Sequence, residues 1–177
     1  MLHAGDLDAY ATIFGDPEVA RYLGDGKPLD RAAAWRSLAL QLGHWALRGY
    51  GLWAVEERAS GRLVGRVGLL RPEGWPGLEL AWALAREAWG KGYATESAGR
   101  VLAHAFAEMG VERLISLIYP ANARSIRVAE RLGERLEGRT ALFGSEVLVY
   151  GIDRATWRAR PIGLDPPPRP APPTPAP

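Results

Sequence analysis

In the stretch LELAWALAREAWGKGYATE, residues 78–96, an apolar segment containing one carboxylate, Glu79, leads through a short polar turn to a Gly-Lys-Gly and a helical segment. The pattern predicts a strand that ends at Leu84 and a helix that begins at Tyr93. Glycines let backbone N–H groups approach an anion closely, and the first turn of a helix leaves N–H groups unpaired beside a partial positive charge. We therefore expect residues 90–95 to hold an anion, and phosphate fits best.

The segments on either side complete one sheet. Apolar periodicity, caps and turn residues predict helices at residues 7–14, 17–23, 31–47, 93–109 and 123–132, and strands at 52–56, 63–70, 78–84, 114–119, 135–142 and 146–152. The connection from residue 84 to residue 114 is long enough for a parallel crossover. The prediction is an α/β (α+β) domain with a mixed, mostly antiparallel central sheet and flanking helices. In such units, ligand sites lie at the carboxyl ends of strands.

Length and composition indicate a single domain followed by a tail. The 177 residues suggest a single domain over residues 1–160, and the proline-rich segment 161–177 is expected to be disordered or polyproline-like. No apolar run approaches the roughly 20 residues of a membrane span, and the first residues lack the pattern of a signal peptide. We therefore expect a cytoplasmic protein. The scarcity of Lys, Asn, Gln and Met fits a thermophile, although GC-rich codon usage explains it equally well.

Several classes of site are excluded or disfavoured. The absence of cysteine excludes disulfides, thiolate metal ligands and cysteine nucleophiles. The three histidines form no spaced cluster, so no metal is expected. A Walker A loop fails because Ala85 stands at its first glycine and Gly92 follows the lysine, and a dinucleotide fingerprint fails at Thr95.

Three blocks of sequence give the glycine turn a specific interpretation. They are DPEVARYL at residues 16–23, AREAWGKGYATESA at 85–98 and NARSIRVAERLG at 122–133. Together they resemble the GNAT superfamily of N-acetyltransferases, and the form WGKGYATE resembles the RimJ/RimL branch, which acetylates the N-termini of ribosomal proteins. The resemblance extends over residues 6–157.

The resemblance implies direct transfer of acetyl from acetyl-CoA, as cosubstrate, to an amine, without a covalent enzyme intermediate. It implies that the strand ending at Leu84 pairs with the pantetheine arm and splays from its neighbour, while the backbone from Gly90 to Thr95 binds pyrophosphate. Lys91 would add a charge near the phosphates, or equally be a solvated surface lysine. The cofactor-binding residues expected on this basis are Ala83, Leu84, Arg86, Trp89, Gly90, Lys91, Gly92, Tyr93, Ala94, Thr95, Asn122 and Ser125.

Two residues are expected to carry the proton chemistry. Glu79 interrupts an apolar strand, and a buried carboxylate is costly without a partner or a role, so it is the candidate base. The alternative is that strand alternation turns it to solvent. Relatives often use a tyrosine to protonate the CoA thiolate, but Ala129 stands at that position, which leaves Ser125 as the candidate. Asn122 would bind pantetheine, cap its helix, or do both.

The acceptor side is less well defined. Aromatic residues could line an acceptor pocket, although such residues pack in cores more often; they are Tyr22, His44, Trp45, Trp53, Trp75 and Trp82. Glu134 replaces an aromatic that is common in relatives, and the five residues before the first helix leave little room for the usual first strand. A sheet without that strand would expose an edge to a second copy, as in a homodimer.

The leading functional hypothesis is acetylation of a primary amine: a protein N-terminus first, a small amine or antibiotic second. An acyl-CoA sensor or scaffold without turnover is the alternative. An RNA-associated protein with contacts at Arg113, Arg124, Arg127 and Arg131 is a third interpretation. It is disfavoured by a net charge of only +2 and by the lack of a clustered basic face with interleaved aromatics.

Overall fold

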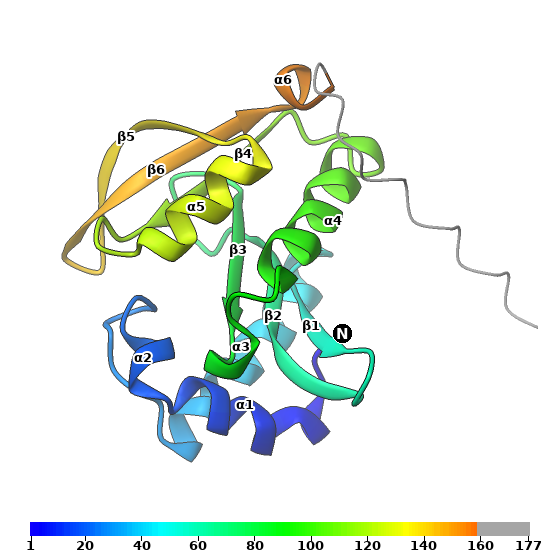
Figure 1. Cartoon of the computed structure of the whole chain (residues 1–177), viewed down its shortest axis with the longest axis vertical. Helices are drawn as coiled ribbons and strands as arrows, with labels where there is room; N and C mark the ends of the chain where they lie inside the picture. The colour runs from blue at the N-terminus through cyan, green and yellow to red at the C-terminus, as the bar shows by residue number, and fades with distance from the viewer. Residues whose placement is uncertain (159–177) are drawn as a thin grey trace, which may run out of the picture.

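Six strands form one open sheet with helices on both faces in the computed structural model, which describes residues 1–158 (Figure 1). The helices are η1 (Ala4–Asp6), α1 (Leu7–Phe14), α2 (Pro17–Ala20), α3 (Arg31–Arg48), η2 (Arg86–Ala88), α4 (Tyr93–Ala107), α5 (Ala123–Leu132) and α6 (Arg154–Arg158). The strands are β1 (Leu52–Glu57), β2 (Arg62–Leu70), β3 (Glu79–Leu84), β4 (Arg113–Ile118), β5 (Arg135–Leu142) and β6 (Ser145–Asp153).

These elements confirm the predicted order of helices and strands. The main difference is α2, which ends at Ala20 because the chain then tightens into a turn in which Leu23 N donates to Ala20 O at 2.8 Å. The short helices η1, η2 and α6 were not predicted. The predicted disordered tail, 161–177, lies outside the described residues.

The strand order β1-β2-β3-β4-β6-β5 confirms a mixed, mostly antiparallel sheet. Only β3 and β4 run parallel, and α4 forms the crossover between them, as predicted from the length of that connection. Residues 1–51 contain no strand, so β1 is an edge of the sheet. This agrees with the expectation that the first strand is missing.

Helices cover the two faces unequally. On one face α4 packs against β2 and β3, and α5 packs against β4 beside α4; on the other, α1 packs against β2 and α3 packs on α1 (Figure 1). The α4 face contains an apolar core in which Leu69, Leu80, Leu102, Phe106 and Leu114 are fully buried. Two aspartates begin helices as predicted, since Asp16 accepts from Glu18 N and Asp30 from Ala33 N.

Candidate functional site

The two parallel strands separate soon after they meet. Their pairing consists of Glu79 opposite Ile115, with Ile115 N donating to Leu78 O at 3.0 Å. Beyond that point β3 continues for five residues without a partner on this side. The carbonyls of Leu80 and Leu84 accept from the side chains of Ser116, in β4, and of Trp89 instead of from backbone N–H groups of β4. Because backbone groups alternate in direction along a strand, those of Trp82 also face the gap.

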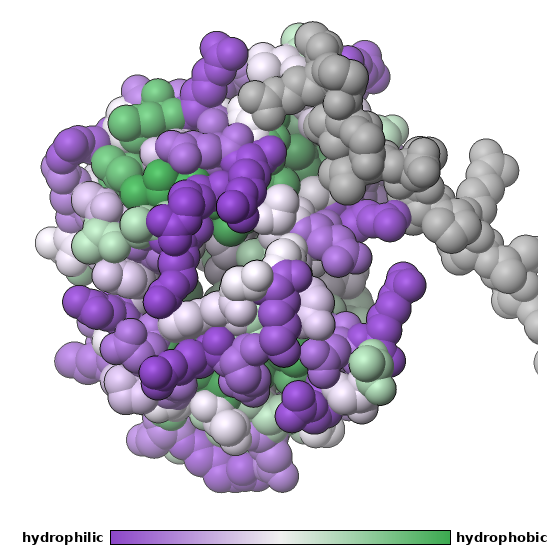
Figure 2. All heavy atoms as spheres, in the orientation of Figure 1, coloured by the Kyte–Doolittle hydropathy of each residue, from purple (hydrophilic) through white to green (hydrophobic). Residues whose placement is uncertain are grey.

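A cavity of about 380 Å³ opens at the carboxyl end of β3, between α2, the turn before α4, and α5. Figure 2 shows this face hollowed near its centre, with hydrophilic side chains around the hollow. The predicted cofactor-binding residues that line it are Ala83, Leu84, Trp89, Gly90, Gly92, Tyr93, Ala94, Thr95, Asn122 and Ser125. The structure thus brings ten predicted residues, from three separate segments, around one cavity.

The turn before α4 exposes backbone donors to this cavity. Gly90 and Gly92 have φ of 75° and 85°, in the left-handed region that favours glycine, and a Cβ on either would meet no atom within 4 Å. Gly92 is the N-cap of α4, and no side chain caps the helix. The N–H groups of the first turn are therefore available to an anion.

Two predicted cofactor residues, Arg86 and Lys91, do not line the cavity. The ammonium of Lys91 lies 3.8 Å from Oε1 of Glu57, at the end of β1, and 5.9 Å from the centre of the Tyr93 ring. Its charge is thus directed to a carboxylate of the β1–β2 hairpin.

Asn122 and Ser125 both lie at the start of α5, on the cavity wall. Oδ1 of Asn122 accepts from Ser125 N at 3.2 Å, so Asn122 caps the helix while it also faces the cavity. The two alternatives for this residue are therefore compatible. The cap involves only the backbone N–H of Ser125, and the Ser125 hydroxyl does not take part in this hydrogen bond.

Glu79 is only 8% exposed, which rules out the solvent-facing alternative. It does not line the cavity but sits where β3 and β4 begin to separate. Its Oε2 accepts from Trp75 Nε1 at 2.7 Å, and the backbone N–H of Leu117 in β4 also donates to the carboxylate. Burial raises the pKa of Glu79 to about 7, against the lowering effect of these donors and of Arg66. A carboxyl with that pKa can exchange a proton near neutral pH.

A second buried carboxyl, Glu134, lies beside the same gap. It is 3% exposed, and its Oε1 lies 3.0 Å from Ser116 Oγ. Burial raises its pKa to about 8, and the nearby charge of Glu79 also contributes to this rise. In the sequence analysis Glu134 was noted only because relatives commonly have an aromatic residue at this position. A carboxylate in place of a large aromatic side chain was the signal that could have revealed this buried acid.

The sequence analysis considered the arginines of the cavity wall only as contacts for RNA and did not assign them to the cofactor site. Arg124, Arg127 and Arg131 lie on the side of α5 that faces the cavity, where their spacing of three and four residues places them in a row. The guanidinium of Arg124 lies 4.3 Å from the centre of the Trp89 ring. These charges suit an anionic ligand.

The aromatic residues considered for an acceptor pocket separate into three groups. Tyr22 and Trp82 line the cavity. Trp75 binds Glu79, and its ring lies 5.9 Å from that of Phe143 in the β5–β6 turn. Trp45 and Trp53 pack edge to face, and His44 contacts Tyr50 O and Arg71 N, so these three are structural.

Within residues 1–158 no group of three or more His, Asp or Glu side chains is placed to hold a metal ion. None of the helices in this part of the chain has the length and apolar character needed to cross a membrane.

Comparisons with known proteins agree on one family. Residues 1–135 match the family model described as an acetyltransferase (GNAT) domain. The chain is 30% identical over 148 residues to the uncharacterised protein YkkB of Bacillus subtilis, a match that covers 80% of this chain and 82% of YkkB. An acetyltransferase structure from Agrobacterium tumefaciens has a TM-score of 0.75 at 30% identity, covering 85% of this chain and 86% of that one.

A second solved structure carries ligands. The spermidine N-acetyltransferase from Vibrio cholerae, in complex with CoA and spermine, has a TM-score of 0.72 and covers 89% of this chain and 95% of its own. Its identity to this chain is 20%, so the likeness shows the fold.

Proposed function

The chain belongs to the acetyltransferase (GNAT) family, and from that premise we propose that it transfers acetyl from acetyl-CoA directly to a primary amine, with a protein N-terminal amine as the acceptor. The observation that carries the proposal is the cavity that joins the glycine turn at residues 90–95 to the gap between β3 and β4. It offers anion-binding N–H groups at one end and free strand edges at the other.

The cavity accommodates the parts of acetyl-CoA in order. The backbone of residues 90–95 would bind the pyrophosphate, and the row Arg124, Arg127 and Arg131 would add positive charge along it. The backbone of Trp82 would pair with the amides of the pantetheine arm, which would bring the thioester toward the opening of the gap. The CoA bound to the Vibrio cholerae relative supports this assignment of the ligand.

Direct transfer needs a neutral amine. An ammonium acceptor would lose one proton to Glu79, whose raised pKa of about 7 suits a base near neutral pH. The amine nitrogen then forms a bond to the thioester carbonyl carbon, the carbon–sulfur bond breaks, and the sulfur leaves as thiolate. The second proton of the nitrogen would pass to that thiolate through the hydroxyl of Ser125, on the cavity wall, so that an amide and a thiol are left and the serine keeps its proton.

The choice of a protein N-terminus rests on the resemblance of residues 89–96, WGKGYATE, to the RimJ/RimL branch. A polyamine is the competing acceptor, because the Vibrio cholerae relative is a spermidine acetyltransferase. An acyl-CoA sensor without turnover is the alternative outside catalysis.

One assay tests the proposal and its competitors. Purified full-length protein is incubated with acetyl-CoA and a panel of peptides with free N-termini, polyamines and aminoglycosides, and thiol release is recorded. We expect release with peptides. Release only with polyamines would change the acceptor class, binding of acetyl-CoA without release on any amine would favour the sensor, and no binding would exclude both CoA-dependent functions.

A further inference from the structure

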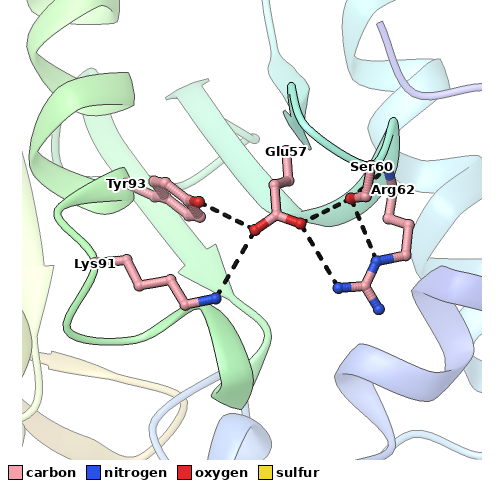
Figure 3. Close-up of polar contacts among 5 residues, drawn as sticks. All are labelled: Glu57, Ser60, Arg62, Lys91 and Tyr93. Atoms are coloured by element: carbon pink, nitrogen blue, oxygen red, sulfur yellow. Dashed lines mark hydrogen bonds and ion pairs between the residues drawn. The ribbon is translucent and has the colours of Figure 1, made fainter.

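One carboxylate ties the glycine turn to the β1–β2 hairpin. Glu57, the last residue of β1, accepts from the hydroxyl of Tyr93 at 3.0 Å, and its Oε1 lies 3.8 Å from the ammonium of Lys91. Figure 3 shows Lys91 and Tyr93 pointing toward Glu57 from the turn and from the start of α4. The two residues that flank Gly92 are therefore held by the same side chain.

The hairpin holds Glu57 from the other side. Ser60 Oγ donates to Oε2 at 2.7 Å, and the guanidinium of Arg62 lies 3.6 Å from the same oxygen (Figure 3). The hydrogen bonds from Ser60 and Tyr93 keep the pKa of Glu57 below its usual value, so it stays ionised at neutral pH. Its side chain is 17% exposed, which limits competition from water.

The indole of Trp89, which donates to Leu84 O, anchors the residue before the turn, whereas the turn itself is open. Gly90 and Gly92 are in the left-handed region with no neighbour within 4 Å of a Cβ position, and no side chain caps α4. Glycine also loses more conformational freedom on ordering than any other residue. The contacts of Lys91 and Tyr93 can thus fix the position of the backbone N–H groups of the turn. Tyr93 also lines the cavity.

We propose that Glu57 is a positioning residue for acetyl-CoA, which fixes the pyrophosphate-binding turn through Tyr93 and Lys91 without touching the ligand. The inference rests on the proposed function, since it assumes that this turn holds the pyrophosphate. It also assigns Lys91 to the support of the turn, where its charge neutralises Glu57.

The test compares Glu57→Ala with Glu56→Ala, which removes an exposed carboxylate from the neighbouring position of β1. Dissociation constants are measured for acetyl-CoA and for S-acetylpantetheine, a donor fragment without the pyrophosphate. We expect Glu57→Ala to weaken acetyl-CoA binding about tenfold, because a hydrogen-bonded charge anchors the turn. Binding of S-acetylpantetheine by this variant, and of both donors by Glu56→Ala, should stay within about twofold of the wild type.

A general loosening of the fold would weaken both donors equally and would overturn the proposal, as would an unchanged affinity for acetyl-CoA. Tyr93→Phe supplies a milder variant, which keeps the ring in the cavity wall and removes only the hydroxyl. Its loss in acetyl-CoA affinity should disappear when Glu57 is already alanine, because both changes break the same contact. Independent, additive losses would contradict a shared role.

Failure of the proposed function can be distinguished from failure of the role proposed for Glu57. If the wild-type protein binds neither donor, both the function and the role of Glu57 are wrong. If it binds acetyl-CoA and the Glu57→Ala variant binds it equally well, only the role of Glu57 is wrong.

Discussion

Oε1 of Glu134 lies 3.0 Å from the hydroxyl of Ser116, which lies 2.8 Å from the backbone oxygen of Leu80. The hydroxyl of Ser116 has one proton, which it can donate to the Leu80 carbonyl or to Glu134. With a proton on Glu134, both contacts can be hydrogen bonds at the same time. The pKa of about 8, raised by burial, agrees with a neutral acid at pH 7. The gap between β3 and β4 thus holds one protonated carboxyl, Glu134, near a second that titrates, Glu79.

This protonation state predicts how stability depends on pH. In the unfolded chain Glu134 ionises near the ordinary glutamate pKa of 4.5, but in the folded protein it keeps its proton up to about pH 8. The unfolded state therefore binds fewer protons between these values, and stability falls as pH rises. We expect Glu134→Gln to remove this contribution, which is roughly 1 kcal/mol of unfolding free energy per pH unit in this window.

Chemical denaturation at pH 5.5, 6.5 and 7.5 measures that slope. Glu130→Gln, an exposed position on α5, is the matched control and should leave the slope unchanged. If Glu134→Gln has the wild-type slope, the acid is ionised in the folded protein.

A second prediction concerns Glu79 as base. The base must be ionised to accept a proton, so kcat should rise with pH through about 7, the raised pKa of Glu79. Because Glu79 and Glu134 influence each other, the measured value belongs to the pair. Glu79→Gln should lower kcat by about 100-fold or more and flatten this rise, while the affinity for acetyl-CoA stays unchanged. A pH–rate profile like that of the wild type would remove Glu79 from this role.

The indole of Trp75 offers a way to shift that pKa. Trp75 Nε1 donates to Glu79 at 2.7 Å, and this donor stabilises the ionised form. Trp75→Phe keeps an aromatic ring beside Phe143 and removes the donor, so the acid limb of the kcat profile should move up by about one pH unit. Phe143→Leu, which leaves the donor in place, should not move it. A shift in both variants would point to solvent entry rather than to the hydrogen bond.

Ser125 can be tested without disturbing α5, because its backbone alone binds Asn122. If its hydroxyl assists the leaving thiolate, Ser125→Ala should lower kcat about tenfold or more with acetyl-CoA. The loss should shrink with an acetyl donor whose thiol is more acidic and leaves without help. An equal loss with both donors would assign the hydroxyl another task.

The sequence predicted most of the elements because these depend on local signals, whereas the residues expected at the cofactor site came from the resemblance of three blocks to a known family. Apolar periodicity and the caps at Asp16, Asp30 and Asn122 define the elements, and the length of the crossover before β4 predicts the parallel pair. The sequence did not determine the orientation of Glu79, since strand alternation alone allowed its side chain to lie on either face of the sheet. It became clear only with Leu117 and Trp75, which come from a different strand and from a loop.

The sequence also did not predict which side chains of the glycine motif point away from the cavity. Lys91 lies within the glycine motif, yet it contacts Glu57, which is distant in sequence. Glu57 carried no local signal of its role, because its partners come from the hairpin and from the turn before α4. Long-range polar contacts of this kind follow from the folded arrangement of the elements, so periodicity and spacing do not reveal them.

The last prediction tests the glycine turn itself. Alanine at Gly90 would be held at φ of 75°, which costs about 1 kcal/mol or more of stability, and its methyl group would face the open cavity. Gly110→Ala is a matched control, since Gly110 has φ of 68°, also meets nothing within 4 Å, and does not line the cavity. Both variants should lose similar stability in thermal unfolding, but only Gly90→Ala should weaken acetyl-CoA, by about tenfold, because the methyl group blocks close approach of the pyrophosphate to the backbone. Equal affinities in the two variants would show that the pyrophosphate lies elsewhere, and would remove the turn from the site.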